Sequence, residues 1–147
     1  MPSTGALKAE QEQRYKRNIQ FTGVGNEGQE KLFRASVLQV GAGGLGSPVA
    51  FYLAAAGIGR IGLVDSDTVS LSNLQRQILH AMPDLGRPKV ISAGEKLKAL
   101  NPDLKLDIYQ ETFRRDSAAD IIKNYDFIIY IHIEFFVFDN RIIAYFR

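Results

Sequence analysis

A run of glycines between two apolar segments is the first place in this sequence where chemistry can be expected. Residues 41–46 read GAGGLG, which satisfies the pattern G-x-G-x-x-G, and they lie between a compact apolar run at 36–40 and a helix-forming stretch at 48–56. Glycine permits a tight turn and, lacking Cβ, lets phosphate oxygens approach backbone N–H groups, while the following helix adds a favourable dipole. The candidate nucleotide-binding glycines are Gly41, Gly43, Gly44 and Gly46.

An acidic residue follows the next apolar run at the spacing that a nucleotide site requires. Asp65 comes directly after the run at 61–64 and lies 19 residues beyond Gly46. A carboxylate at the end of the second strand can accept hydrogen bonds from ribose hydroxyls. The alternative is a glycine turn needed only to pack the helix against the strand. The loop and Asp65 together favour a dinucleotide or nucleotide, and they do not distinguish NAD from ATP.

A polar segment after Asp65 favours a polyphosphate. Residues 65–77 read DSDTVSLSNLQRQ, in which Asn73 can donate amide hydrogen bonds to phosphate oxygens and Arg76 offers a planar fork of donors. Lys89, in the first turn of the next expected helix, can bring a positive charge to the same crevice. A site for a flat nicotinamide ring does not require these polar and cationic side chains. A solvated loop with its charges facing water remains the alternative.

The elements that must position these residues alternate between strand and helix. Apolar runs and alternation predict strands at 36–40, 61–64, 104–109 and 127–133, and helical patterns predict helices at 48–56, 88–100 and 117–123, the last with Asp116 as a possible N-cap. The order predicts an α/β Rossmann-like fold, doubly wound, with a mainly parallel sheet and helices on both faces. We expect a helical segment over 1–35, including a helix-forming stretch at 6–20 and a glycine linker at 23–28. After it, we expect an ATP-binding domain over 36–129 and then a hydrophobic tail over 130–147.

Composition excludes several classes of function. The chain has 147 residues and a formal net charge of +2, which gives little reason to expect nucleic acid or a membrane as the main partner. It contains no cysteine, so that disulfides, cysteine-bound zinc and a cysteine nucleophile are excluded within it. The polar beginning carries no signal peptide pattern. We therefore expect a soluble, cytoplasmic protein.

The motifs taken together resemble one enzyme family. Asp65-x-Asp67, the run LSNLQRQ at 71–77 and Gly86-x-Pro88-Lys89 look like the signature of the MoeB/ThiF/HesA adenylyltransferases, relatives of the ubiquitin-activating enzymes. The segments RYKR at 14–17 and GQEKL at 28–32 resemble the same family in the right order. The resemblance covers roughly residues 12–128 without an obvious gap.

The resemblance implies an activity and a role for each matching residue. Family members use ATP and Mg²⁺ to adenylylate the C-terminal Gly-Gly carboxylate of a ubiquitin-like sulfur-carrier protein, in pathways of the molybdopterin, thiamine or tRNA-thiolation type. Asp65 would hold the ribose, and Asp67 would lie near the nucleotide or Mg²⁺. The residues matching those that contact phosphates and stabilise the transition state are Asn73, Arg76 and Lys89. Arg17 resembles an arginine supplied across a homodimer interface to the partner's ATP.

The family pattern breaks near the end of the chain. The position of the aspartate that binds the magnesium of ATP falls on Ile133, which cannot bind a hard cation, so that the usual Mg²⁺ carboxylate is missing and no metal ligand is assigned. The later half of the family, with its zinc cysteines, is not found. A truncated or frame-shifted, catalytically impaired member is the simplest interpretation. An NAD(P)-binding oxidoreductase and a non-catalytic nucleotide-binding or dimerisation module are the alternatives.

The two histidines receive no catalytic role from the sequence. His132 has apolar neighbours on both sides, which is typical of a strand histidine that bonds to a backbone group. His80 is expected to cap or pack near the nucleotide loop.

Overall fold

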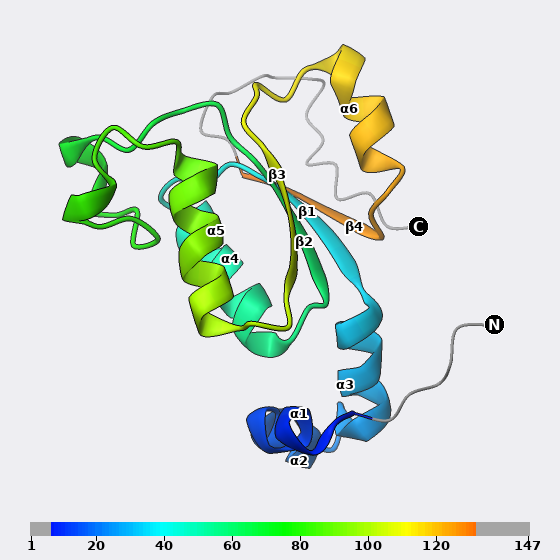
Figure 1. The fold of residues 1–147 in the computed structure, drawn as a ribbon. Coiled ribbons are helices and arrows are strands. Elements are labelled where there is room, and N and C mark those ends of the chain that lie inside the picture. Colours follow the sequence, from blue (N-terminus) through cyan, green and yellow to red (C-terminus); the bar gives the residue numbers. More distant parts are fainter. Residues whose placement is uncertain (1–6, 132–147) are drawn as a thin grey trace.

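A four-stranded parallel sheet organises the chain, as a computed structural model shows for residues 7–131, except for the side chains of residues 115–117. The strands lie in the order β3-β2-β1-β4 (Figure 1). Each neighbouring pair is parallel. The strand bounds are β1 Ser36–Val40, β2 Arg60–Val64, β3 Lys105–Tyr109 and β4 Phe127–Tyr130. The predicted Rossmann-like class is confirmed.

Helices cover both faces of the sheet, because the central strands β1 and β2 bury side chains on both sides. The helices α4 (Gly46–Ala56) and α5 (Lys89–Leu100) lie on one face, and α6 (Arg115–Ile122) lies on the other (Figure 1). The first face buries a core of strand and helix side chains that includes Ile61 and Leu97. The second face packs Leu38 against Ile121 and other apolar residues. The arrangement is therefore doubly wound.

The strand order places a topological switch beside the first loop. The chain runs from β1 outward through β2 to β3 and then crosses to β4 on the other side of β1. The chain leaves β1 toward α4 on one face, whereas it reaches β4, on the other side of β1, through α6 on the opposite face. Ligands of doubly wound sheets bind in the crevice that such a switch creates. The glycine loop begins at this point, directly after Val40.

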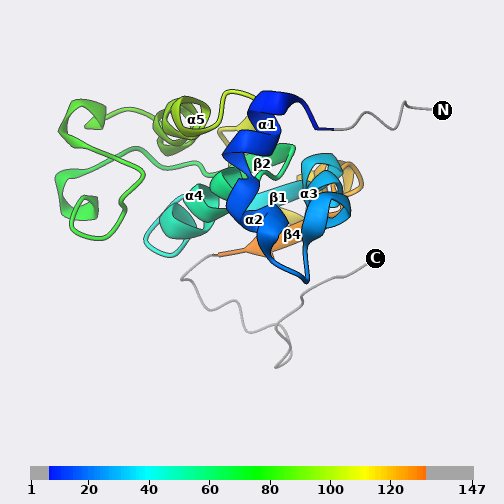
Figure 2. The same cartoon turned by 90° about the horizontal axis from the view of Figure 1, so that it is seen from below.

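Three N-terminal helices pack at the opposite end of the sheet. They are α1 (Ala9–Arg14), α2 (Lys16–Gln20) and α3 (Gly25–Arg34), and α3 ends just before β1 begins (Figure 2). Tyr15 is fully buried there, and Asn101 donates hydrogen bonds of 2.9 Å to its hydroxyl and to the Ala54 carbonyl. Gln29 donates to the Ala56 carbonyl at 2.8 Å. These side chains bind carbonyls in the last turn of α4, of which that of Ala54 also accepts the Gly57 N–H.

The structure corrects three details of the sequence analysis. The stretch at 6–20 forms two short helices that meet at Tyr15, because this side chain turns into the core instead of continuing a surface helix. Gly25 and Gly28 lie inside α3 and not in a linker. The helix α6 begins at Arg115 with Arg114 as its N-cap, so Asp116 is not the cap. Within residues 7–131, each helix is too short or too polar to cross a membrane.

Candidate nucleotide-binding site

The glycine loop is folded so tightly that two of its positions have no room for a side chain. Gly41 has a φ of +100°, a conformation that L side chains rarely adopt, and its α-carbon faces the carbonyl of Ile131 at the end of β4. A Cβ on Gly46 would collide with the Gly41 carbonyl oxygen and lie 3.1 Å from Nε2 of Gln39. Gly43 and Gly44 are more open. The glycine pattern therefore reflects close backbone packing at both ends of the loop.

The Gln39 side chain connects the two ends of this loop by hydrogen bonds. It lies fully buried in β1, and its Nε2 donates to the carbonyl oxygens of Gly41 at 3.0 Å and Gly46 at 2.9 Å. Because both bonds come from one amide nitrogen, the start and the end of the loop are held at a fixed separation. Gln39 was not predicted as a site residue, although a polar residue inside the apolar run SVLQV was an available signal.

Asp65 joins the glycine loop to the polar segment that follows β2. Its Oδ2 accepts a hydrogen bond from the Ala42 N–H at 2.8 Å, and its Oδ1 accepts one from the Asp67 N–H at 2.9 Å. Each carboxylate oxygen retains a second lone pair for a further donor. Asp65 therefore lies at the edge of the loop, as expected, and it also orders the backbone on both sides.

Backbone pairing brings Lys89 to Asp67. Residues 67–69 and 86–89 run antiparallel, with a bridge between Thr68 and Pro88 and a hydrogen bond of 3.0 Å from the Lys89 N–H to the Asp67 carbonyl. Nζ of Lys89 lies 2.8 Å from Oδ2 of Asp67. The Lys89 side chain is 7% exposed, whereas that of Asp67 is 66% exposed. The whole lysine side chain is therefore nearly buried, and its ammonium group meets the exposed carboxylate of Asp67.

Asn73 is the last residue of the short 3-10 helix at Leu71–Asn73, and Arg76 lies in the turn that follows it. The aliphatic part of Arg76 lies against Gly44, since a Cβ built there would be 3.4 Å from its Cγ and Cδ. Its Nη1 donates to the Ser72 carbonyl at 3.2 Å. Oδ1 of Asn73 accepts from the Ser70 N–H at 3.1 Å, while its Nδ2 has no acceptor within residues 7–131. Arg76 therefore borders the glycine loop, and Asn73 offers an amide donor one turn away.

His80 packs directly behind the glycine loop, as the sequence predicted. Nε2 lies 3.1 Å from the Ala42 carbonyl oxygen, and Nδ1 lies 2.9 Å from Oγ of Ser92 on α5. Burial lowers the pKa of His80 and outweighs the opposing effect of its hydrogen bond to Ala42. The imidazole is therefore neutral at neutral pH.

Asp84, also buried, makes the stability of this region sensitive to acid. Burial by itself would raise the pKa of Asp84, but hydrogen bonds from Lys96 and from the Ala81 N–H outweigh it and lower the pKa to about 2. Arg87 donates a further bond at 3.1 Å. Because the carboxyl of the unfolded chain titrates near 3.8, the folded state binds fewer protons between these values.

We expect this carboxylate to stabilise the fold fully above about pH 4 and to lose that contribution as the pH falls toward 2. The contribution is on the order of 1 kcal/mol, because the cations that pair with Asp84 are partly exposed and screened by water. Urea unfolding of the protein and of Asp84→Asn at pH 5, 4, 3 and 2 measures it. The stability difference between the two should shrink with acid; a constant difference would contradict the assignment.

Other predicted residues lie away from the loop or outside the described chain. Arg17 is exposed on α2, at the end of the sheet where the strands begin, and its Nη1 lies 3.5 Å from Oε1 of Gln20. Ile133 and His132 lie outside the described residues, as does the predicted extension of β4 beyond residue 131. Within residues 7–131 there is no group of three or more His, Cys, Asp or Glu side chains placed to hold a metal ion.

Comparison with known sequences identifies relatives of this chain. The sulfur carrier protein adenylyltransferase of Thermus thermophilus is 47% identical over 116 residues, which are 79% of this chain and 43% of that protein. The probable adenylyltransferase/sulfurtransferase MoeZ of Mycobacterium tuberculosis is 44% identical over 124 residues, which are 84% of this chain and 32% of that protein. The chain thus spans less than half the length of either relative.

Solved structures share the fold of the described residues. The E. coli tRNA N6-threonylcarbamoyladenosine dehydratase TcdA, in complex with ATP, superposes with a TM-score of 0.81 at 26% identity and covers 87% of this chain and 52% of its own. The structure of E. coli MccB with ATP gives a TM-score of 0.70 at 31% identity and covers 78% of this chain and 36% of its own. The model of the ThiF family matches residues 15–131, which is most of the chain. With a Rossmann-like sheet, a glycine loop at its switch point and this match, the chain belongs to the ThiF family.

Proposed function

We propose that this chain binds ATP at the glycine loop and supplies the nucleotide site of an adenylyltransferase that acts on the C-terminal carboxylate of a ubiquitin-like sulfur-carrier protein. The observation that carries the proposal is the convergence of the loop, Asp65, Arg76 and the Lys89–Asp67 pair on one edge of the sheet. The name of the Thermus relative supports the carrier as substrate, and TcdA and MccB were both solved with ATP.

In this reaction a carboxylate oxygen of the carrier attacks the α-phosphorus of ATP. The bond from that phosphorus to the bridging oxygen of the β-phosphate breaks, and pyrophosphate leaves with the electron pair. The protein contributes position and charge instead of a nucleophile. Backbone N–H groups of residues 43–45 would face the phosphates, and Arg76 and Lys89 would neutralise charge that develops on them. Asn73 would donate its free amide, and Asp65 would accept from the ribose.

Arg17 belongs to the proposal only in a homodimer. Its helix lies at the far end of the sheet from the glycine loop of the same chain, so that it cannot serve that loop directly. A second copy placed with its α2 over the first copy's site would supply the arginine in trans. We assign no residue to Mg²⁺, because Asp67 is paired with Lys89 and both oxygens of Asp65 accept backbone N–H groups.

Titration with ATP and with NAD tests the choice of nucleotide. We expect saturable binding of ATP and much weaker binding of NAD, because Arg76 and Lys89 supply cations for a triphosphate at this edge. Tighter binding of NAD would overturn the proposal in favour of an oxidoreductase. Exchange of labelled pyrophosphate into ATP, with a Gly-Gly carrier and Mg²⁺ present, tests the reaction itself. We expect exchange by this chain alone to be slow, since Ile133 replaces the magnesium carboxylate of the family.

A further inference from the structure

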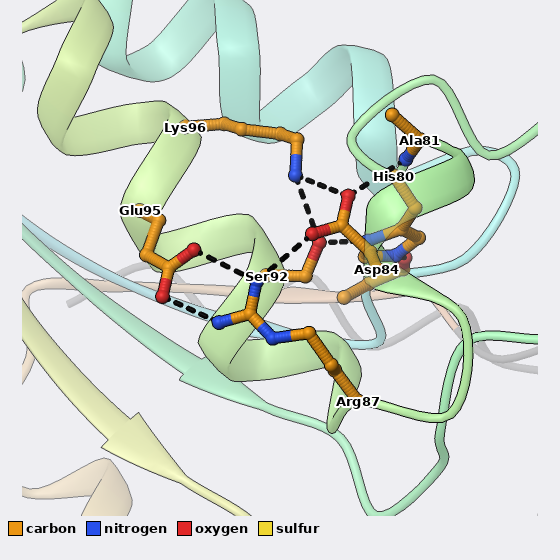
Figure 3. A network of polar contacts seen from close by, with 8 residues as sticks. His80, Ala81, Asp84, Arg87, Ser92, Glu95 and Lys96 are labelled. Carbon is orange, nitrogen blue, oxygen red and sulfur yellow. Dashed lines mark hydrogen bonds and ion pairs between the residues drawn. The ribbon is translucent and has the colours of Figure 1, made fainter.

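A chain of polar contacts runs from the surface of α5 to the back of the glycine loop. Glu95 pairs with Arg87 at 2.5 Å, Arg87 donates to Asp84, and Lys96 bonds both to Asp84 and, at 3.1 Å, to Ser92 Oγ (Figure 3). The network ends at His80, whose two ring nitrogens contact Ser92 and the Ala42 carbonyl. None of these side chains except His80 reaches the loop, so His80 is the point of contact between the network and the loop.

The partners of His80 fix which nitrogen carries its proton. A carbonyl oxygen can only accept, so Nε2, at 3.1 Å from the Ala42 oxygen, must carry the hydrogen. The neutral ring then has Nδ1 as an acceptor, and the Ser92 hydroxyl must donate to it. Lys96 donates to Ser92 Oγ and does not compete for the hydroxyl proton, for which Nδ1 of His80 and the nearby Asp84 carboxylate are the acceptors. The Ala42 carbonyl thereby selects the tautomer, and the Ser92 hydroxyl accommodates it by donating to Nδ1.

The bond to Ala42 determines where the next N–H points. All peptide bonds in residues 7–131 are trans, and in a planar trans unit the carbonyl and the following N–H lie on opposite sides. His80 and α5 lie on the side of the Ala42 carbonyl, so the Gly43 N–H is directed away from them. Within the described residues no acceptor meets that N–H. The Ala42 N–H is bound by Asp65, so both peptide units around Ala42 are fixed by side chains.

We propose that His80 is a positioning residue for the phosphate site, which holds the Ala42–Gly43 peptide unit so that the Gly43 N–H stays aimed at a polyphosphate. This role rests on the proposed function, because the loop is assumed to bind ATP. It requires no contact between His80 and the nucleotide. A preorganised N–H binds an anion better than one that must reorient, since the cost of ordering the loop is met when the protein folds.

Replacement by two residues of similar size separates positioning from packing. His80→Gln can keep an N–H donor toward Ala42, whereas His80→Leu fills the space without one. We expect His80→Leu to raise the Kd for ATP about tenfold, the effect of one well-placed hydrogen bond, and His80→Gln to raise it less than about threefold. The Kd for adenosine, which has no phosphate, should stay within about twofold in both.

Calorimetric titration with ATP and adenosine, thermal unfolding, and the amide signal of ¹⁵N-labelled Gly43 give the readouts. The Gly43 signal should shift in His80→Leu and remain near its original position in His80→Gln. Equal losses of ATP affinity in the two variants, or an equal loss for adenosine, would overturn the positioning role. If the unmodified protein bound no ATP, the proposed function would fall and this role with it. ATP binding that His80→Leu leaves unchanged would overturn the positioning role alone.

Discussion

Gly46→Ala is expected to raise the Kd for ATP by about 100-fold, which corresponds to losing a hydrogen bond of about 3 kcal/mol from the displaced loop to a charged phosphate. The new methyl group would collide with the Gly41 carbonyl oxygen and press on Nε2 of Gln39. Neither neighbour can move freely. The Gly41 N–H donates a hydrogen bond of 2.8 Å to the Val64 carbonyl, and the Gln39 side chain is fully buried. We also expect a loss of about 3 kcal/mol in the free energy of unfolding, as overpacking of a tight site causes. Calorimetry and urea unfolding measure the two effects.

Gly43→Ala is the matched control within the same loop. A Cβ at this position would lie 3.6 Å from Nε2 of Gln77, an ordinary contact distance, so the free energy of unfolding should change by less than about 1 kcal/mol. If Gly46→Ala were as stable as Gly43→Ala, the tight closure of the loop would not exist in solution.

Lys89→Met should have the second largest effect. We expect the Kd for ATP to rise roughly 30-fold to 100-fold, because the variant loses one charge-assisted hydrogen bond of about 2–3 kcal/mol. Methionine can fill the buried channel of the lysine stem without its charge. Asp67 would then lack its cation and would repel the phosphates. Calorimetric titration with ATP, AMP and adenosine measures the change, which should grow with the number of phosphates.

Lys98→Met provides the control for removing a positive charge from α5. Lys98 lies near the other end of this helix and donates to the Pro102 carbonyl at 3.0 Å. Its replacement should leave the Kd for ATP within about twofold. A similar loss in Lys98→Met would mean that the net charge of the chain, and not the position of Lys89, governs binding.

Local patterns allowed the sheet and the loop to be predicted from sequence. Apolar or alternating runs of four to seven residues separated by helix-forming stretches indicated the parallel strands, and the spacing from Gly46 to Asp65 placed an acid at the carboxyl edge. The fold class follows from this alternation because short crossovers between parallel strands are helical and right-handed. The relation of Lys89 to the site was inferred from its place in the first turn of the next helix and from the family resemblance.

Contacts between distant segments were not predictable in the same way. The pairing of Asp67 with Lys89 depends on antiparallel backbone bonds between 67–69 and 86–89, for which the sequence carries no periodic pattern. The break at Tyr15 depends on burial against Asn101, 86 residues away. Gln39 was overlooked because a single polar residue in a strand does not reveal its acceptors. Each of these features is decided by tertiary packing, which overrides local propensity.

The close approach of Ile131 to Gly41 has a practical consequence for redesigning this protein. The Ile131 N–H donates to the Val40 carbonyl at 2.8 Å, and its own carbonyl faces the α-carbon of Gly41. The last described residue of the chain is thus docked against the first residue of the loop. An insertion placed directly after Ile131 would therefore begin beside the glycine loop and would need only a short tether to reach the nucleotide proposed to bind there.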